Sequence, residues 1–264
     1  PPHFFYHPHP PKPDSSTSRG LGDVYKRQTE YLPLATSQDH KTIGEGDVGL
    51  NTGGMGAYSP VPFVNDELDT VIREKVIEPT IRGLSEDGIM FRGFLYAGLM
   101  IDSNYNPKVL EYNCRFGDPE TQPIMLRLKS DLIDMIQTCF NGGISNYDID
   151  WDQKSAMGVV ISSHGYPESY ETGKEIIGLD TLSDRTDVKV FHSGTCSEND
   201  SILSNGGRVL CVTALGDDFS SKGVNIDQAY VRFRPTGQDL DIYAGKFKNL
   251  SLIHISEPTR RRGM

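Results

Sequence analysis

The chain has 264 residues, of which 36% are hydrophobic and 23% are charged, and its formal net charge at pH 7 is −10. This length and composition are those of a globular protein with one large domain or two ordinary ones, and no apolar run is long enough to predict a membrane span. The acidic balance argues against non-specific binding to nucleic acid or to anionic membranes.

The cysteines form neither a CxxC pair nor a spacing with histidine that suits a metal; they are Cys114, Cys139, Cys196 and Cys211. We expect reduced thiols, and therefore a cytoplasmic protein, because structural disulfides are rare in that compartment.

The two ends of the chain differ from the rest. Residues 1–18 are a Pro/His/Ser mixture without a helical or strand period, and SRGLGDVYKRQ (18–28) resembles the in-frame translation of a transposase adapter used to prepare DNA sequencing libraries. LSLIHISEPTR (250–260) resembles the translation of the reverse complement of that adapter. We therefore predict that residues 1–28 and 250–264 are adapter-derived tails, and that the sequence between them is a partial one.

The first predicted elements are a short strand-like segment, residues 30–36, and a long glycine-rich loop, residues 37–62. A loop of that length within a compact domain is usually functional or disordered. Asn65 is a plausible N-cap for a helix, and Pro79 is expected to kink or split that helix. Its apolar stripe consists of Leu68, Val71, Ile72, Val76, Ile77, Ile81 and Leu84.

Residues 91–102 and 106–116 predict an antiparallel hairpin, because a turn-rich connection separates two strand-like runs. Helical spacing then extends over residues 121–140, and Asn141-Gly142-Gly143 is expected to end that helix.

From about Ser155 onwards the sequence predicts a second module. Strands are expected at residues 155–167, 189–195 and 207–216, while residues 223–233 fit either a helix or a strand. The predicted fold class is α+β, with domains at residues 29–150 and 151–249.

The stretch KVLEYNCRFGDPETQPIM (108–125) begins as a strand and then fills with polar groups. Glu111 and Asn113 are two residues apart and share one face of an extended strand, whereas Leu110 and Tyr112 are expected to face a core. A carboxylate and an amide oxygen together suit Mg²⁺ that also holds substrate phosphates. The same pair would also occur on an ordinary, partly exposed strand face.

The residues that follow strengthen the case for a site. Arg115 offers a planar fork for a carboxylate or phosphate. Asp118-Pro119-Glu120 is too acidic and too stiff to continue the strand, and Thr121 can begin the next helix, whose N-terminus favours an anion.

Two further motifs are candidates for substrate contacts. The glycines of NTGGMGAYSP (51–60) free the backbone to present successive N–H groups to an anion, although a flexible surface loop would have the same composition. In SQDHK (37–41), Asp39 could orient an amine, while His40 and Lys41 could meet an anion; a solvated turn is the alternative.

Five stretches, taken in order, resemble the phosphoribosylamine–glycine ligase (glycinamide ribonucleotide synthetase) family: TSQDHK, NTGGMGAYSP, GFLYAGLMID, LEYNCRFGDPETQ and NGGRVLCVTALG. The resemblance implies the C-terminal part of an ATP-grasp fold, an antiparallel sheet with flanking helices, followed by a small α+β domain. It also implies ATP-dependent ligation of glycine to 5-phosphoribosylamine through glycyl phosphate, a step of purine biosynthesis.

Residue by residue, the resemblance makes Glu111 and Asn113 ligands of Mg²⁺ or Mn²⁺, and it assigns Arg115 and Asp118 to catalysis. It implies a substrate-binding set of Asp39, His40, Lys41, Asn51, Thr52, Gly53, Gly54, Met55, Gly56 and Thr121. The implied partners are small molecules (ATP, glycine and 5-phosphoribosylamine), without nucleic acid or membrane, and the expected state is a monomer.

The family's amino-terminal domain and most of its nucleotide-binding lid have no counterpart in the sequence, so the chain by itself is expected to be inactive. Three alternatives remain open. One is another ATP-grasp ligase, such as a carboxyaminoimidazole ribonucleotide synthase, against which NTGGMGAYSP argues. The others are a non-catalytic metal-binding module and one domain of a multifunctional fusion.

Overall fold

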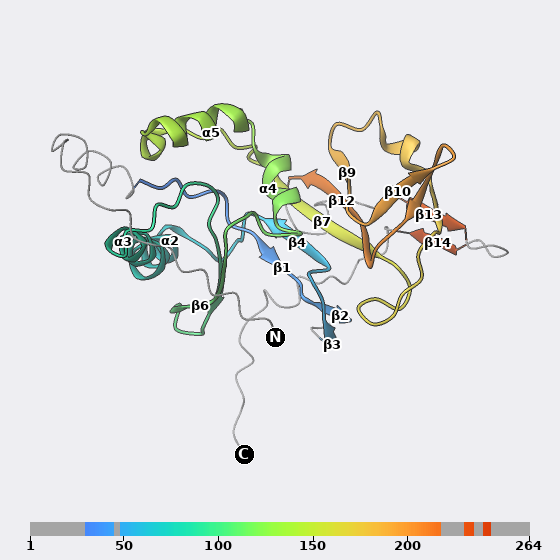
Figure 1. Ribbon diagram of the computed structural model, residues 1–264, viewed down its shortest axis with the longest axis horizontal. Coiled ribbons are helices and arrows are strands. Elements are labelled where there is room, and N and C mark those ends of the chain that lie inside the picture. The colour runs from blue at the N-terminus through green and yellow to red at the C-terminus, as the bar shows by residue number, and fades with distance from the viewer. Residues whose placement is uncertain (1–29, 45–47, 218–229, 235–239, 244–264) are drawn as a thin grey trace, which may run out of the picture.

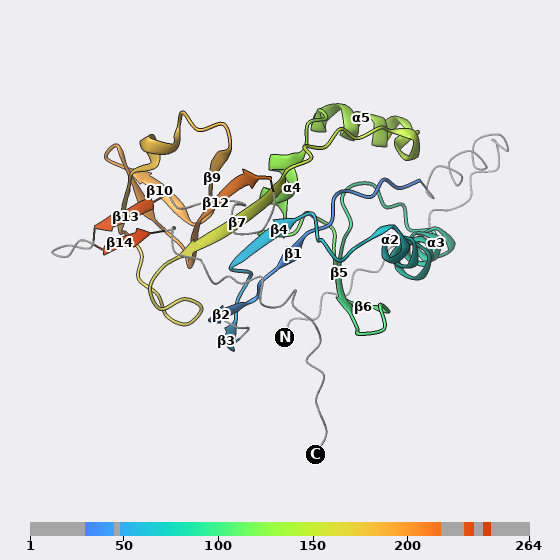
Figure 2. The ribbon, with the colours of Figure 1, turned by 180° about the vertical axis from the view of Figure 1, so that it is seen from behind.

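The computed structural model describes residues 30–44, 48–217, 230–234 and 240–243 of the chain. Within them, helices and antiparallel strands are mixed, as the predicted α+β class requires. A central sheet lies between helices α2 and α3 at one end of the molecule and a second sheet at the other (Figure 1); the opposite view shows the same order (Figure 2).

The central sheet has the strand order β1-β4-β7-β12-β9, and every neighbouring pair is antiparallel. Its strands are β1 (Gln38–Asp39), β4 (Gly56–Ser59), β7 (Ser155–Ser162), β12 (Arg208–Gly216) and β9 (Val188–His192). Val209, Leu210 and Val212 of β12 are fully buried, in keeping with the apolar run that predicted this strand.

This sheet joins segments from both sides of the predicted domain boundary at residues 150 and 151. Strand β4 pairs with β7 through Gly56↔Val159 and Ser59↔Ala156. The proposed division into two domains therefore separates stretches of sequence that share one sheet.

The prediction of a continuous loop over residues 37–62 is wrong. The stretch contains β1, β4 and a small hairpin of β2 (Thr42–Gly44) with β3 (Val48–Asn51). Strand β4 is buried at every position, because it lies between β1 and β7 in the sheet and is packed against residues 121–127. A Cβ on Gly56 would stand 2.7 Å from the carbonyl oxygen of Gly158. By contrast, the strand-like segment 30–36 forms no strand.

The predicted helix and its cap are confirmed: Oδ1 of Asn65 accepts from the backbone N–H of Leu68 at 2.9 Å. The helix is split, as expected from Pro79, into α2 (Asp66–Ile72), the π-helical turn η2 (Arg73–Ile77) and α3 (Glu78–Glu86). Pro79 stands just after the π-helical turn, and the helical backbone continues through Ile77 and Glu78 into α3.

The predicted hairpin is formed by β5 (Tyr96–Ile101) and β6 (Pro107–Asn113). Its register shifts, because Gly98 pairs with Glu111 while Leu99 pairs with Val109, so that Leu110 is the extra residue of a bulge. Leu110 and Tyr112 are 64% and 42% exposed. The expectation that they face a core is therefore wrong among the described residues, where both faces of β6 are exposed from Lys108 to Tyr112.

The predicted helix over residues 121–140 is two helices, α4 (Thr121–Arg127) and α5 (Leu132–Asn141). The break follows from Asp131, whose side chain caps α5 by accepting from the N–H groups of Ile133 and Asp134, and from Leu128, which bridges to Trp151. The helix ends at the predicted glycines, with Gly142 at φ 83°. A 3₁₀ turn, η3 (Ile144–Asn146), follows.

The second sheet has the order β10-β11-β8-β13-β14. Its strands are β10 (Thr195–Glu198), β11 (Ser201–Ser204), β8 (Glu175–Ile177), β13 (Tyr230–Arg234) and β14 (Leu240–Tyr243), and the 3₁₀ turn η4 (Leu179–Leu182) precedes β9. Of the ambiguous segment 223–233, residues 230–233 are strand and the rest lies outside the described residues. The predicted tails, 1–28 and 250–264, also lie outside them.

Candidate active site

The residues predicted from the sequence come together where three parts of the chain meet: strand β1 with the residues that follow it, the end of β6 and the start of α4. The turn after β6 touches the glycine loop, residues 51–56, so closely that a Cβ on Gly54 would collide with Cδ of Pro119. Gly54 has φ +113°, a conformation that favours glycine. The two motifs therefore form one site rather than two.

Lys41 lies between two carboxylates. Its Nζ is 3.6 Å from Oδ2 of Asp39 and 3.4 Å from Oε1 of Glu111. Burial lowers the pKa of Lys41, but the charges of Asp39 and Glu111 outweigh it and leave the pKa above its ordinary value. Oδ2 of Asp39 is buried and accepts no hydrogen bond from the described residues, so this oxygen has capacity for a further donor.

Glu120 is a further member of the site, for which the sequence motifs indicated no role. It is 4% exposed, and its Oε1 accepts from the hydroxyl of Tyr96 at 2.7 Å. Burial raises the pKa of the Glu120 carboxyl, and the negative charge of Asp39 adds to the effect. Tyr96 pairs with Asn113 across the hairpin, so the signal that could have found this contact was the register of β5 against β6.

Glu111 and Asn113 lie on the last three positions of β6, and both present hard oxygen donors of the kind that Mg²⁺ takes together with substrate phosphates. Among the described residues no group of three His, Cys, Asp or Glu side chains could hold a metal unaided. Because these are only two protein donors, the pair fits an ion that keeps water or phosphate ligands. Lys41, whose side chain is 47% exposed, can turn away from Glu111 when such an ion binds.

The glycine loop does not present the free N–H groups that its composition suggested. The N–H of Gly53 donates to the Tyr166 hydroxyl at 3.0 Å, that of Gly54 to Oγ1 of Thr52 at 3.0 Å, and that of Met55 to the carbonyl of His40 at 2.7 Å. These bonds fix the loop, so any anion contact would come from side chains around it. Asn51 ends β3, paired with Thr42.

The remaining predicted residues are placed as follows. Arg115 is exposed, and its Nη1 donates to the carbonyl of Phe116 at 2.8 Å. The Thr121 hydroxyl donates to the carbonyl of Gly117 in the turn before α4. The ring of His40 lies 5.9 Å from that of Tyr58, and its backbone N–H donates to the carbonyl of Gly56. Asp118 is bound by Arg208, a residue for which the sequence offered no local signal.

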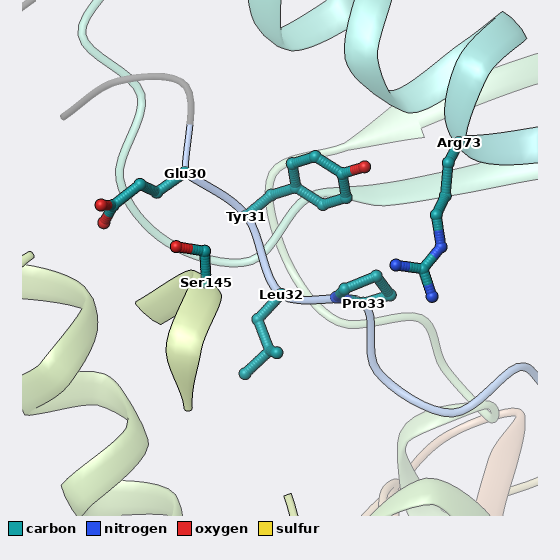
Figure 3. Close-up of a pocket in the computed structure, with 6 residues that line it drawn as sticks. All are labelled: Glu30, Tyr31, Leu32, Pro33, Arg73 and Ser145. Carbon is teal, nitrogen blue, oxygen red and sulfur yellow. The ribbon is translucent and has the colours of Figure 1, made fainter. Parts of the chain in front are cut away.

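A cavity of about 1060 Å³ adjoins this cluster, with Lys41, Arg115 and Glu120 among its polar lining and apolar side chains of α2, α3 and α5 on the other walls. A smaller cavity, of about 490 Å³, adjoins the larger one and is lined by Glu30, Tyr31, Leu32, Pro33, Arg73 and Ser145 (Figure 3); all of these except Ser145 also line the larger cavity. The larger cavity is the one that can supply room for a substrate beside charged groups.

Two family models match the sequence. The ATP-grasp (A) domain of phosphoribosylglycinamide synthetase matches residues 25–121, and the C domain of the same synthetase matches residues 156–234. Together with the antiparallel sheet and the charged cluster at its edge, these matches define the class as that of ATP-grasp proteins. The chain belongs to the phosphoribosylglycinamide synthetase family.

Individual relatives agree with this placement. The phosphoribosylamine–glycine ligases of Salmonella typhimurium and Vibrio cholerae are 57% and 53% identical over 186 residues, which are 70% of this chain and 43% of each relative. The crystal structure of the ligase from Thermotoga maritima is 31% identical with a TM-score of 0.65, covering 74% of this chain and 47% of that one. The chain thus spans less than half the length of these relatives.

Proposed function

We propose that the chain is part of a phosphoribosylamine–glycine ligase, which joins glycine to 5-phosphoribosylamine at the expense of ATP. The observation that carries the proposal is the convergence of the family-specific motifs: Glu111 and Asn113 at the end of β6, the Asp118-Pro119 turn, and the glycine loop packed against that turn. The 57% identity to the Salmonella typhimurium ligase supports the same assignment.

In this reaction the γ-phosphoryl group of ATP passes to the glycine carboxylate, releasing ADP. The amine of phosphoribosylamine then attacks the carbonyl carbon of the acyl phosphate, the new C–N bond forms, and phosphate leaves. No protein nucleophile is needed, so the work of the protein is to position reactants and to neutralise charge. Glu111 and Asn113 would hold Mg²⁺ or Mn²⁺, which neutralises charge on the phosphates when bound.

The chain's own residues suit the rest of the task. Lys41 keeps its positive charge, because Asp39 and Glu111 hold its pKa high, and it can face the phosphates once Glu111 binds the ion. Oδ2 of Asp39 accepts no hydrogen bond from the described residues, and once Lys41 turns towards the phosphates this oxygen can accept from an ammonium group. Arg115, exposed beside the larger cavity, offers a fork to a carboxylate or phosphate.

The partners of the proposed reaction are small molecules, and the described residues contain no helix long and apolar enough to cross a membrane. A cytoplasmic protein with Mg²⁺ or Mn²⁺ as its ion and with ATP, glycine and 5-phosphoribosylamine as its substrates completes the proposal. The monomeric state expected from the sequence stays a prediction.

A chimaera tests the function directly. The aligned 186-residue segment of the Salmonella typhimurium ligase is replaced by the matching segment of this chain, and ADP release is measured with both substrates, with each alone and with neither. We expect release that requires both glycine and phosphoribosylamine. A folded chimaera that binds ATP without such turnover would refute the proposal, and turnover with a different carboxylate or amine would favour another ATP-grasp ligase.

The chain by itself is assayed beside the chimaera. We expect no turnover from it, because it aligns with 43% of the Salmonella typhimurium relative. Calorimetry with Mg-ATP separates a residual binding module, which would give measurable heat, from a chain that needs the rest of the enzyme to bind nucleotide.

A further inference from the structure

Arg208, the first residue of β12, reaches from the central sheet to both motifs of the candidate active site. Its Nη1 donates to the carbonyls of Gly53 at 2.9 Å, Gly54 at 3.4 Å and Asp118 at 3.0 Å. Its Nη2 donates to Oδ2 of Asp118 at 2.9 Å. One guanidinium therefore joins segments that lie 155 and 90 residues before it in the sequence.

The glycine loop is shaped to accept this guanidinium. A Cβ on Gly53 would stand 3.0 Å from Cζ of Arg208, so the absence of a side chain lets the backbone lie against the planar group. On its other side, the N–H of Gly53 donates to the hydroxyl of Tyr166, which follows β7. The loop is thus held by two side chains of the segment that matches the C domain of the family.

Asp118 is held at both carboxylate oxygens. Oδ2 accepts from Arg208, and Oδ1 accepts from Nε2 of Gln122 at 3.0 Å. The Arg208 side chain is 22% exposed, so its ion pair is partly shielded from water. A guanidinium fork loses little side-chain entropy per bond, which suits a group that must keep four contacts at once.

We propose that Arg208 is a positioning residue of the candidate active site: it sets the conformation of the glycine loop and the direction of the Asp118 carboxylate without itself contacting substrate. The inference rests on the proposed function, because it assigns the loop and Asp118 to the substrate side of that reaction. It also gives the C-domain segment a role in the chemistry, through one side chain.

Hydrogen exchange on the full chain tests the contact. In Arg208→Ala we expect the amides of Gly54 and Met55 to exchange about tenfold faster or more, since the loop loses the anchor of its carbonyls. Arg208→Lys should give nearly the same increase, because one ammonium cannot replace the fork. The control is Arg185→Ala, which removes a partly exposed pair with Asp187 in the same segment and should leave the loop unchanged.

Kinetics in the chimaera test the role. Arg208→Lys should raise the KM for glycine or for phosphoribosylamine about tenfold while leaving the KM for ATP within about twofold, a split that a general loss of structure would not give. Asp118→Asn, which keeps the shape of the side chain, should change the same KM in the same direction. Arg185→Ala should leave the KM for glycine, for phosphoribosylamine and for ATP unchanged.

The outcomes separate the two claims. Unchanged loop exchange in both Arg208 variants overturns the contact, and faster exchange with unaltered KM values overturns the positioning role. If the unsubstituted chimaera fails to turn over, the proposed function fails, and the positioning role, which rests on it, is overturned as well. The exchange data would then describe a structural contact alone.

Discussion

Substitution of Arg127 tests which hydrogen bonds hold helix α4, and with it the start of the candidate site, against strand β4. Arg127 is the last residue of α4, only 7% exposed, and its guanidinium donates to Oγ of Ser59 at 2.9 Å and to the carbonyls of Lys154 at 2.8 Å and Asp152 at 3.3 Å. It therefore ties the helix that begins beside Glu120 and Thr121 to strand β4.

Replacing Arg127 by Met keeps most of the apolar volume and removes all three bonds. The Ser59 side chain is completely buried, so it is left without its donor at a cost of about 1–3 kcal/mol, and each of the two partly exposed carbonyls adds about 0.5–1.5 kcal/mol. We expect the free energy of unfolding to fall by about 2–5 kcal/mol, allowing for partial rescue by water.

Equilibrium unfolding of the full chain in urea measures this difference, with the m-value checking that the same surface is exposed. The matched control is Arg73→Met, which removes an i,i+4 pair with Asp69 and a contact with the Tyr31 side chain on a half-exposed helix face, and should cost no more than about 1 kcal/mol. A loss below about 1 kcal/mol for Arg127→Met at an unchanged m-value would show that the buried bonds are not what anchors α4.

Three further predictions concern the site and its surroundings. In the chimaera, Glu111→Gln should lower kcat/KM by about a hundredfold and raise the Mg²⁺ concentration needed for half-maximal rate, whereas Glu74→Gln on the exposed side of η2 should do neither; an unaltered Mg²⁺ requirement would remove Glu111 from the ion site. For Glu120, burial favours the protonated form in the folded state, so its contribution to stability is present below the ordinary glutamate value of 4.5 and is lost as the pH rises through the higher folded pKa. Glu120→Gln should therefore gain stability relative to the unsubstituted chain between pH 4 and pH 8, as followed by urea unfolding, and a gap that narrows over this range would contradict the assigned cause. Burial raises the pKa of Cys211 to about 11, so a thiol reagent at pH 8 should label exposed Cys114 at once and Cys211 only on unfolding; equal labelling rates would contradict the buried environment.

The sequence predicted the elements whose signals are local. Asn65 caps its helix because a side-chain oxygen accepts from an N–H group three residues further on, and the Asn141-Gly142-Gly143 stop follows from a glycine at positive φ. The hairpin was equally readable, since its two strands are adjacent in sequence. The class of the fold was predicted correctly from such pieces.

What the sequence did not reveal depends on contacts between distant segments. Strand β4 has the composition of a loop because Gly56, Ala57 and Ser59 are small, and its strand conformation depends on pairing with the distant strands β1 and β7. The bulge at Leu110 interrupts the regular pairing of β6 with β5, which a period of two cannot anticipate. Glu120 belongs to the site through its hydrogen bond from Tyr96, and Arg208 through its hydrogen bond to Asp118. No local sequence pattern predicts either contact.

The placement of the glycine loop has a consequence for how the protein folds. The carbonyl of Met55 accepts from the N–H of Val160, and Gly53 bonds to residues 113 and 155 positions further along the chain. Closing such long segments carries an entropic cost that must be met before any of these contacts forms. We therefore expect the loop to acquire its native protection late in refolding, after α2, α3 and the hairpin, so that pulse-labelling of its amides reports when the candidate site is assembled.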